Sequence, residues 1–155
     1  MAAFGISLAS LAAMGNDFVT LVVTKDLDVP AQTAWNRIGD FCQVDKWSEL
    51  RCTCKPGSGG AGTVRDIDFA GGKIEELMVA KTPLSYTYIN LGESLPFYHG
   101  TMAVESVGAE RSKIVYTFLW DQETLTTEQR QHEHDVRVKV FGTSLNKMKK
   151  LAEGR

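Results

Sequence analysis

The alternation of apolar and polar residues along the chain predicts a mostly extended structure that ends in one long helix. The segment 17–27, DFVTLVVTKDL, is rich in β-branched side chains, which favour strands. Similar runs follow, separated by glycine-rich or polar turns, and this spacing is typical of antiparallel hairpins. The six further strands are expected at 48–55, 63–70, 73–81, 84–91, 99–107 and 113–121.

Helical patterns occupy only two parts of the chain. Pro30 suits the first turn of a short helix, and a second helical turn is expected at 40–45. Thr126 and Gln129 resemble a capping box, and apolar spacing predicts one long helix over 126–152. This order of elements predicts an α+β fold in which a seven-stranded curved antiparallel sheet wraps around the long C-terminal helix, with room for a cavity between them.

The predicted strand at 73–81 has a carboxylate on each of its two faces. Strand side chains alternate between faces, so Lys73 and Glu75 share one face and Glu76 lies on the other. A charge buried alone is expensive. The carboxylate on the covered face therefore needs a partner.

Length and composition indicate a single domain, which we expect at 17–155. The chain has 155 residues, of which 43% are hydrophobic and 23% charged, as in ordinary globular domains. The net charge is −2 and there is no basic block, which argues against a nucleic-acid partner. The KMKK near the C-terminus is interpreted as a solvated helix end.

The segment 1–16 is apolar and rich in small residues, which leaves its role open. Ala13-Met14-Gly15 resembles a signal-peptide cleavage site, but the segment lacks Lys and Arg and is too short to span a membrane. It is interpreted as a tail or a signal-like segment, and no stable membrane insertion is expected. The protein is expected to be cytoplasmic, or periplasmic or secreted if the segment is a signal peptide.

Three cysteines are present, at positions 42, 52 and 54. Cys52 and Cys54 lie two apart on one predicted strand, so they share a face and would pair poorly with each other. The favoured interpretation is three reduced thiols in a cytosolic protein. A bridge from Cys42 to this strand is the alternative.

Four segments together resemble a known family. They are VPAQTAWNRIGDFCQVDKW, GAGTVRDIDFAGGKIEEL, LSYTYINLGESLPFYHGTMAV and IVYTFLW. In their order and spacing, the chain resembles the helix-grip superfamily, also called SRPBCC or START-like, and most closely its bacterial polyketide cyclase/dehydrase and lipid-transport branch. The resemblance covers about 18–152. The chain is more distantly similar to plant abscisic acid receptors, but their gating loop is shortened here to FAGG and their latch is missing, so hormone gating with a phosphatase partner is not expected.

The resemblance implies a hollow interior that holds a hydrophobic ligand. It places Glu75 inside, with Arg65 and Lys73 as partners, and leaves Glu76 in solvent. A satisfied ion pair between strands and ordinary aromatic packing are the structural alternatives. The full set expected to line the cavity is Trp47, Arg65, Ile67, Phe69, Lys73, Glu75, Tyr86, Tyr88, Asn90, Tyr98, Tyr116, Phe118, Trp120, His132, Val136 and Val140.

A catalytic version needs a proton acceptor close to a ligand carbon or hydroxyl. Glu75 and His132 are the candidates, and Tyr88 or Tyr98 could donate to a ligand carbonyl whose oxygen Arg65 stabilises. This chemistry suits aldol cyclisation and dehydration of a polyketide.

No cofactor or metal is expected. His132 and His134 lie two apart on the predicted helix, so they point about 200° from each other and cannot chelate one ion.

The first hypothesis for the function is a binding or transport protein for a lipid, polyketide or aromatic compound, as a monomer or homodimer. The second is a cofactor-independent cyclase, dehydratase or lyase. A partner-interaction domain with a nearly closed cavity is a third.

Overall fold

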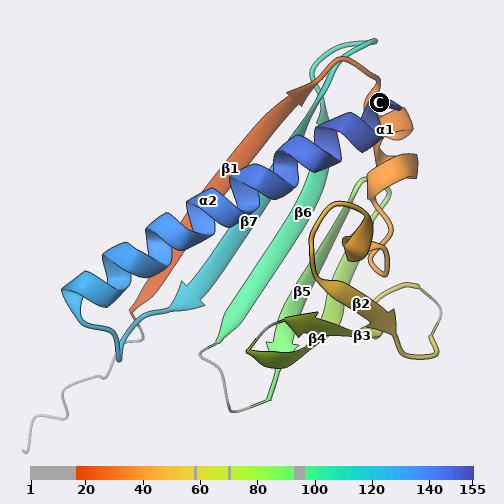
Figure 1. Ribbon diagram of the computed structural model, residues 1–155. Helices are drawn as coiled ribbons and strands as arrows, with labels where there is room; N and C mark the ends of the chain where they lie inside the picture. The colour runs from red at the N-terminus through yellow and green to blue at the C-terminus, as the bar shows by residue number, and fades with distance from the viewer. Residues whose placement is uncertain (1–16, 58, 70, 93–96) are drawn as a thin grey trace, which may run out of the picture.

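The computed structural model describes residues 17–57, 59–69, 71–92 and 97–155. Seven strands form one antiparallel sheet in the order β1-β7-β6-β5-β4-β3-β2, and the long helix α2 lies across its concave face (Figure 1). The predicted helix-grip architecture is confirmed. The strands are β1 (Phe18–Leu27), β2 (Arg51–Cys54), β3 (Val64–Phe69), β4 (Gly72–Thr82), β5 (Ser85–Leu91), β6 (Tyr98–Ser106) and β7 (Ser112–Asp121).

The short first helix and the long C-terminal helix lie where the sequence places them, whereas the second helical turn, predicted at 40–45, begins only at Val44. The short helix α1 (Ala31–Ile38) and a 3-10 turn, η1 (Val44–Lys46), follow β1, and α2 spans Thr127–Ala152. The capping box forms as predicted: the Gln129 N–H donates to Thr126 Oγ1 at 3.3 Å, and the Thr126 N–H donates to Gln129 Oε1 at 2.8 Å. None of the helices in the described ranges is long and apolar enough to cross a membrane. The segment 1–16 lies outside the described residues.

Strand β2 is shorter than predicted, because the chain turns before it. The Leu50 N–H donates to Ser48 Oγ at 3.1 Å, a side-chain contact that replaces a strand hydrogen bond. Regular pairing with β3 therefore begins only at Arg51.

The core lies where α1 and the C-terminal part of α2 cover β5, β6 and β7. Met102, Ile114 and Phe118 are completely buried on the inner face of the sheet, and Ile38 of α1 is nearly so. Each such side chain contributes about 1.5–3 kcal/mol through burial. These side chains fill the space between the two helices and this part of the sheet.

Helix α2 is packed along only part of its length. Leu145 and Met148 are buried, whereas Val136 and Val140 are 41% and 51% exposed. The helix contacts β1 and α1. Its middle therefore stands off from the β3–β5 half of the sheet.

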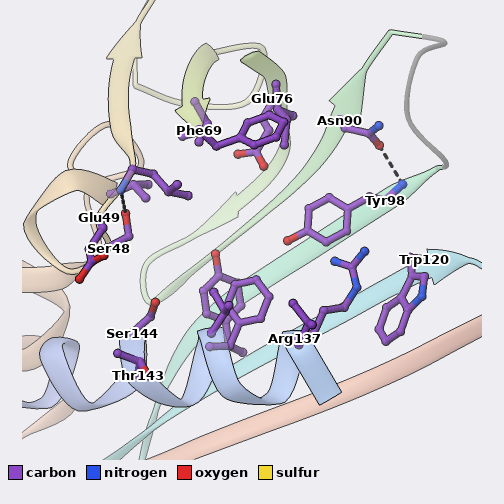
Figure 2. Close-up of a pocket in the computed structure, with 18 of the residues that line it drawn as sticks. Ser48, Glu49, Phe69, Glu76, Asn90, Tyr98, Trp120, Arg137, Thr143 and Ser144 are labelled. Atoms are coloured by element: carbon purple, nitrogen blue, oxygen red, sulfur yellow. Dashed lines mark hydrogen bonds between the residues drawn. The ribbon is translucent and has the colours of Figure 1, made fainter. Parts of the chain in front are cut away.

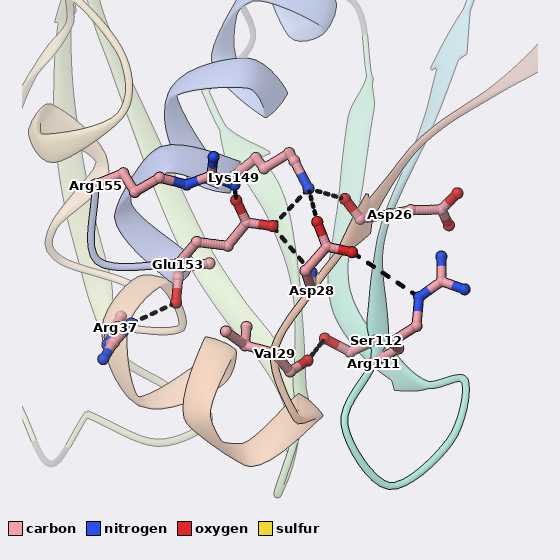
Figure 3. A network of polar contacts seen from close by, with 10 residues as sticks. Asp26, Asp28, Val29, Arg37, Arg111, Ser112, Lys149, Glu153 and Arg155 are labelled. Atoms are coloured by element: carbon pink, nitrogen blue, oxygen red, sulfur yellow. Dashed lines mark hydrogen bonds and ion pairs between the residues drawn. The ribbon is translucent and has the colours of Figure 1, made fainter.

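A polar network fixes the C-terminal end of α2 to the turn after β1 (Figure 3). Glu153 Oε1 accepts from the Asp28 N–H at 2.9 Å and from Lys149 Nζ at 2.5 Å. Lys149 also donates to the Asp26 carbonyl at 2.9 Å, and Arg37 of α1 donates to the Ala152 carbonyl at 2.7 Å. These bonds set the angle at which α2 crosses the sheet.

A disulfide joins Cys42, in the loop after α1, to Cys54 of β2, with 5.5 Å between the Cα atoms. The favoured prediction of three reduced thiols is wrong, and the alternative bridge from Cys42 is confirmed. The loop after α1 folds back over β2, which brings the two sulfurs together. Cys52 is free, and burial raises the pKa of its thiol.

Candidate functional site

A cavity of about 870 Å³ lies between α2 and the inner face of the sheet (Figure 2). Phe69, Val136 and Val140 line it although they are 37%, 41% and 51% exposed, so the cavity opens to solvent beside them. The predicted residues that line it are Trp47, Arg65, Ile67, Phe69, Tyr88, Asn90, Tyr98, Tyr116, Trp120, Val136 and Val140.

Two predicted wall residues lie in the core behind the cavity. Tyr86 is 1% exposed and packs against Trp35 and Phe41, with ring centroids 5.9 and 5.2 Å away. Phe118 is completely buried, and the ring of Phe141 from α2 stacks on it with 3.6 Å between centroids. The inward direction of both strands is as predicted, but α1 and Phe141 cover these two rings.

The prediction that Glu75 and Lys73 face the cavity is wrong. The Glu75 side chain is 39% exposed and pairs with Lys55, while the Lys73 ammonium lies 3.1 Å from Asp66 and is 58% exposed. All four side chains lie on the outer face of the sheet. The physical reason is the register: β3 and β4 pair so that Asp66, not Arg65, lies opposite Glu75.

Glu76 is the carboxylate of the cavity wall, contrary to the expectation that it faces solvent. It lies directly opposite Arg65 in the β3–β4 register, and both residues are buried. Nε and Nη2 of Arg65 each lie 2.7 Å from Glu76 Oε2, and Nη1 donates to the Phe41 carbonyl at 2.5 Å. The guanidinium also lies 3.9 Å from the Phe41 ring centroid and 4.7 Å from that of Tyr88. Arg65 thus holds Glu76 in place.

Burial has the largest effect on the pKa of Glu76, and it raises that pKa. Burial raises the pKa of its carboxyl, the charge and hydrogen bond of Arg65 lower it, and the pKa remains above its ordinary value of 4.5. A carboxyl group of this kind exchanges its proton closer to neutral pH than one in solvent. Such groups in clefts are candidates for acid–base chemistry.

Three tyrosines from three strands form a chain of hydroxyl groups. The Tyr88 hydroxyl lies 3.1 Å from that of Tyr98 and 2.9 Å from that of Tyr116. Burial raises the pKa of all three above the ordinary value of 10.0, so all three remain protonated at neutral pH. Two hydrogen bonds use two of the three O–H donors. Within the described ranges one donor is thus left over, and it is available to a ligand.

The cavity-facing side of α2 includes Val136 and Val140 as predicted, but it is centred on other residues. His132 is exposed and does not line the cavity, so its predicted catalytic placement is wrong. The residues that do line it include Glu133, Arg137, Phe141 and Ser144. Their spacing of four, four and three marks one helical face, and this periodicity was the available signal. These four positions do not form an apolar stripe, because they combine charged, aromatic and small residues, so an apolar pattern could not predict them.

Trp47 and the loop around η1 form the wall nearest the disulfide. The Trp47 side chain is 3% exposed, and its ring lies 6.3 Å from that of Tyr116. Its indole N–H is buried and has no hydrogen-bond partner among the described residues. Buried indoles usually have such a partner. In the part of the chain that the structure describes, no group of three His, Cys, Asp or Glu side chains is placed to hold a metal ion.

A long helix held by a curved seven-stranded antiparallel sheet, with an internal cavity between them, defines a helix-grip protein of the SRPBCC or START-like superfamily. A sequence model of the family "Polyketide cyclase / dehydrase and lipid transport" matches residues 19–153. The protein belongs to this family. A comparison with curated protein sequences finds no match.

Solved structures share the fold at low sequence identity. A protein from Thermobifida fusca, solved by solution NMR, is 20% identical with a TM-score of 0.71, over 86% of this chain and 92% of its own. The Zhui aromatase/cyclase from Streptomyces sp. R1128 is 18% identical with a TM-score of 0.68, over 88% and 94%. Norcoclaurine synthase from Thalictrum flavum, a point mutant in complex with a transition-state analogue, is 13% identical with a TM-score of 0.65, over 89% and 96%.

Proposed function

We propose that the protein binds a hydrophobic small molecule, such as a lipid, a polyketide or an aromatic compound, in the cavity beneath α2. The observation that carries this proposal is the open, mainly apolar cavity of about 870 Å³, a size in the range of small-molecule sites. Soluble domains ordinarily close such space by packing side chains. Here α2 is fixed at its end and leaves the space open.

The wall supports a ligand with an apolar body and a few oxygen atoms. Tyr88, Tyr116 and Phe141 offer aromatic surface, while the spare tyrosine O–H donates to a ligand oxygen. The family description, which names polyketides and lipids, is consistent with such molecules.

Two substitutions on the same helix test whether the cavity is the binding site. Val140 lines the cavity and Val138, two residues earlier, does not, yet they are 51% and 40% exposed. Val140→Trp fills the space and is expected to lower the affinity for the apolar dye N-phenyl-1-naphthylamine by roughly tenfold or more. Val138→Trp is the matched control, and its affinity is expected to remain within about twofold of the original protein. Equal effects of the two substitutions would place the dye on the surface.

Glu76 favours a second candidate function, a cofactor-independent polyketide cyclase or dehydratase. Its carboxylate would remove a proton from a carbon between two ligand carbonyls, and the enolate would then attack a third carbonyl to close a ring. The carboxyl group would return this proton to the alkoxide that forms, giving a hydroxyl group. It would then remove the second proton of the same carbon and pass it to that hydroxyl group, which leaves as water while the carbon–carbon double bond forms. Tyr88 or Tyr98 would donate to the enolate oxygen, and Arg65 would position Glu76. The raised pKa of Glu76 supports this role.

The test of this second function is turnover of a poly-β-ketone chain, followed by loss of one water in the mass of the product. Glu76→Gln keeps the shape of the side chain and is expected to lower turnover by roughly 100-fold. Unchanged dye affinity in this variant shows that the cavity is intact. Turnover that survives the substitution removes the acid–base role and leaves the binding function standing.

A further inference from the structure

We infer that Arg137 forms an anion subsite in the cavity, so that the ligand is an amphipathic acid whose acidic group lies against α2. This inference rests on the proposed binding function. It concerns the wall opposite Glu76, since Arg137 comes from α2 and Glu76 from β4 (Figure 2).

Two aromatic rings hold the Arg137 side chain inside the cavity. Its guanidinium carbon lies 4.6 Å from the Trp120 ring and 5.5 Å from the Tyr98 ring. Figure 2 shows the side chain reaching from α2 toward these two residues. Contacts of this kind leave the edge of the guanidinium, which carries the N–H groups, available to an acceptor. The side chain is therefore oriented before any ligand arrives.

The hydrogen-bonding capacity of Arg137 is mostly unused. A guanidinium has five N–H donors. Among the described residues its only hydrogen-bond partner is Glu133, whose Oε2 accepts from Nη2 at 3.2 Å. Its Nε is buried and has no partner in the described part of the chain. Four donors thus remain, and a carboxylate or sulfonate can accept two of them side by side.

The other cations that line the cavity are matched or solvated. Arg65 is paired with Glu76, and Lys147 lies 3.1 Å from Glu49 at the rim. Lys139 is exposed, so water satisfies its ammonium group. Arg137 differs from the two lysines because its side chain is only 24% exposed. It differs from Arg65 because its partner Glu133 is 40% exposed, whereas the partner of Arg65 is buried.

The carboxylates beside Arg137 do not already fill this subsite. Glu133 accepts a single hydrogen bond from Arg137, four residues away on the same helix. Asp121 also lines the cavity, and its Oδ1 accepts from the Glu123 N–H at 2.9 Å. An acidic ligand would gain charge-assisted hydrogen bonds from the guanidinium while its apolar part lies on the aromatic wall.

Two dyes that differ by one acidic group test the inference. They are N-phenyl-1-naphthylamine, which is neutral, and 8-anilino-1-naphthalenesulfonate, which has the same rings and a sulfonate. The original protein is expected to bind the sulfonate dye roughly tenfold or more tightly than the neutral one. Arg137→Gln is expected to remove this preference, because it should lower the affinity for the sulfonate dye roughly tenfold more than the affinity for the neutral dye. Arg137→Lys keeps the charge but not the planar pair of N–H donors. Its preference for the sulfonate dye should therefore lie between those of the original protein and of Arg137→Gln.

Lys139→Gln is the matched control, because it removes the same charge from the same helix at an exposed position. A loss of preference as large as that of Arg137→Gln would show a general charge effect and overturn the inference. Equal affinities of the original protein for the two dyes would also overturn it, and would leave the binding function intact. Failure of the original protein to bind either dye would reject the proposed function itself, and the anion subsite with it.

Discussion

Replacing Arg65 by Met tests the most consequential polar contact of the cavity wall. The substitution keeps an unbranched apolar side chain over Phe41 but removes the guanidinium. It deletes the two contacts to Glu76 Oε2, both 2.7 Å long, and the hydrogen bond to the Phe41 carbonyl. Glu76 is then left as a buried carboxylate without its counter-ion.

The magnitude follows from burial. Arg65 is 2% exposed and Glu76 is 6% exposed, and removing one partner of such a buried pair costs about 3–5 kcal/mol. For a chain of this length the loss corresponds to a fall in Tm of roughly 10 °C. Lys73→Met is the control, because Lys73 was also expected inside but pairs with Asp66 on the outer face. Its cost is expected to be at most about 1 kcal/mol.

The assay is urea unfolding, followed by circular dichroism at about pH 7 and about pH 5. Burial raises the pKa of Glu76 in the native protein, and loss of Arg65 removes the opposing influence. A carboxyl whose pKa is higher in the folded than in the unfolded state stabilises the fold as pH falls toward the ordinary value of 4.5. The penalty of Arg65→Met should therefore be smaller at the lower pH.

A second substitution separates charge from packing. Adding Glu76→Leu to Arg65→Met removes the stranded carboxylate and should return the free energy of unfolding to within about 1 kcal/mol of the original protein. If Arg65→Met costs no more than Lys73→Met, or if its penalty is the same at both pH values, the buried Arg65–Glu76 pair does not have the stabilising effect described.

Three further predictions concern other parts of the fold. Reduction of the Cys42–Cys54 disulfide, whose cysteines lie 12 positions apart, should lower the free energy of unfolding by about 3 kcal/mol in a urea titration, whereas Cys52→Ser should not change the response to reductant. Glu153→Gln should destabilise the protein by about 1 kcal/mol at neutral pH. Although burial of the Glu153 carboxyl acts in the opposite direction, hydrogen bonds from Lys149, the Asp28 N–H and Arg155 lower its pKa from 4.5 to about 2. This stabilisation is complete above the ordinary pKa and is lost as pH falls toward about 2, so thermal melts of the two proteins should converge in acid. Gly100→Ala should cost about 1–3 kcal/mol, because the new Cβ would lie 2.4 Å from the Tyr88 ring, whereas Gly142→Ala on α2 meets no atom within 4 Å and should stabilise the helix by about 1 kcal/mol. The two substitutions should change the stability in opposite directions, and a stabilising Gly100→Ala would contradict the position of the Tyr88 ring.

Alternation and turn spacing predict the strands and the hairpins that join neighbours along the chain, and the order of elements together with the family resemblance indicated the helix-grip fold. The pairing of β1 with β7 joins strands far apart in the sequence, and no local pattern contains it. Which face of β4 is covered could not be predicted in the same way. Leu77 and Val79 on one face match Ile74 and Met78 on the other, so the apolar pattern is balanced. Only the β3–β4 register, which sets Arg65 opposite Glu76, decides between the faces.

The cavity-facing stripe of α2 was harder to predict for a related reason. A helix that packs on a core shows an apolar stripe, but this one borders open space over much of its length. Arg137 therefore lies on the inward face where a sequence pattern favours an outward position. The disulfide needed knowledge of how the loop after α1 folds back, which no local pattern contains.

The three tryptophans can report whether a hydrophobic ligand binds inside the cavity. Trp47 and Trp120 line the cavity, whereas Trp35 of α1 packs in the core against Tyr86. We would follow the three indole N–H signals by NMR while adding N-phenyl-1-naphthylamine. We expect the signals of Trp47 and Trp120 to shift and the signal of Trp35 to stay in place. Binding of the dye without movement of the Trp47 and Trp120 signals would contradict binding inside the cavity.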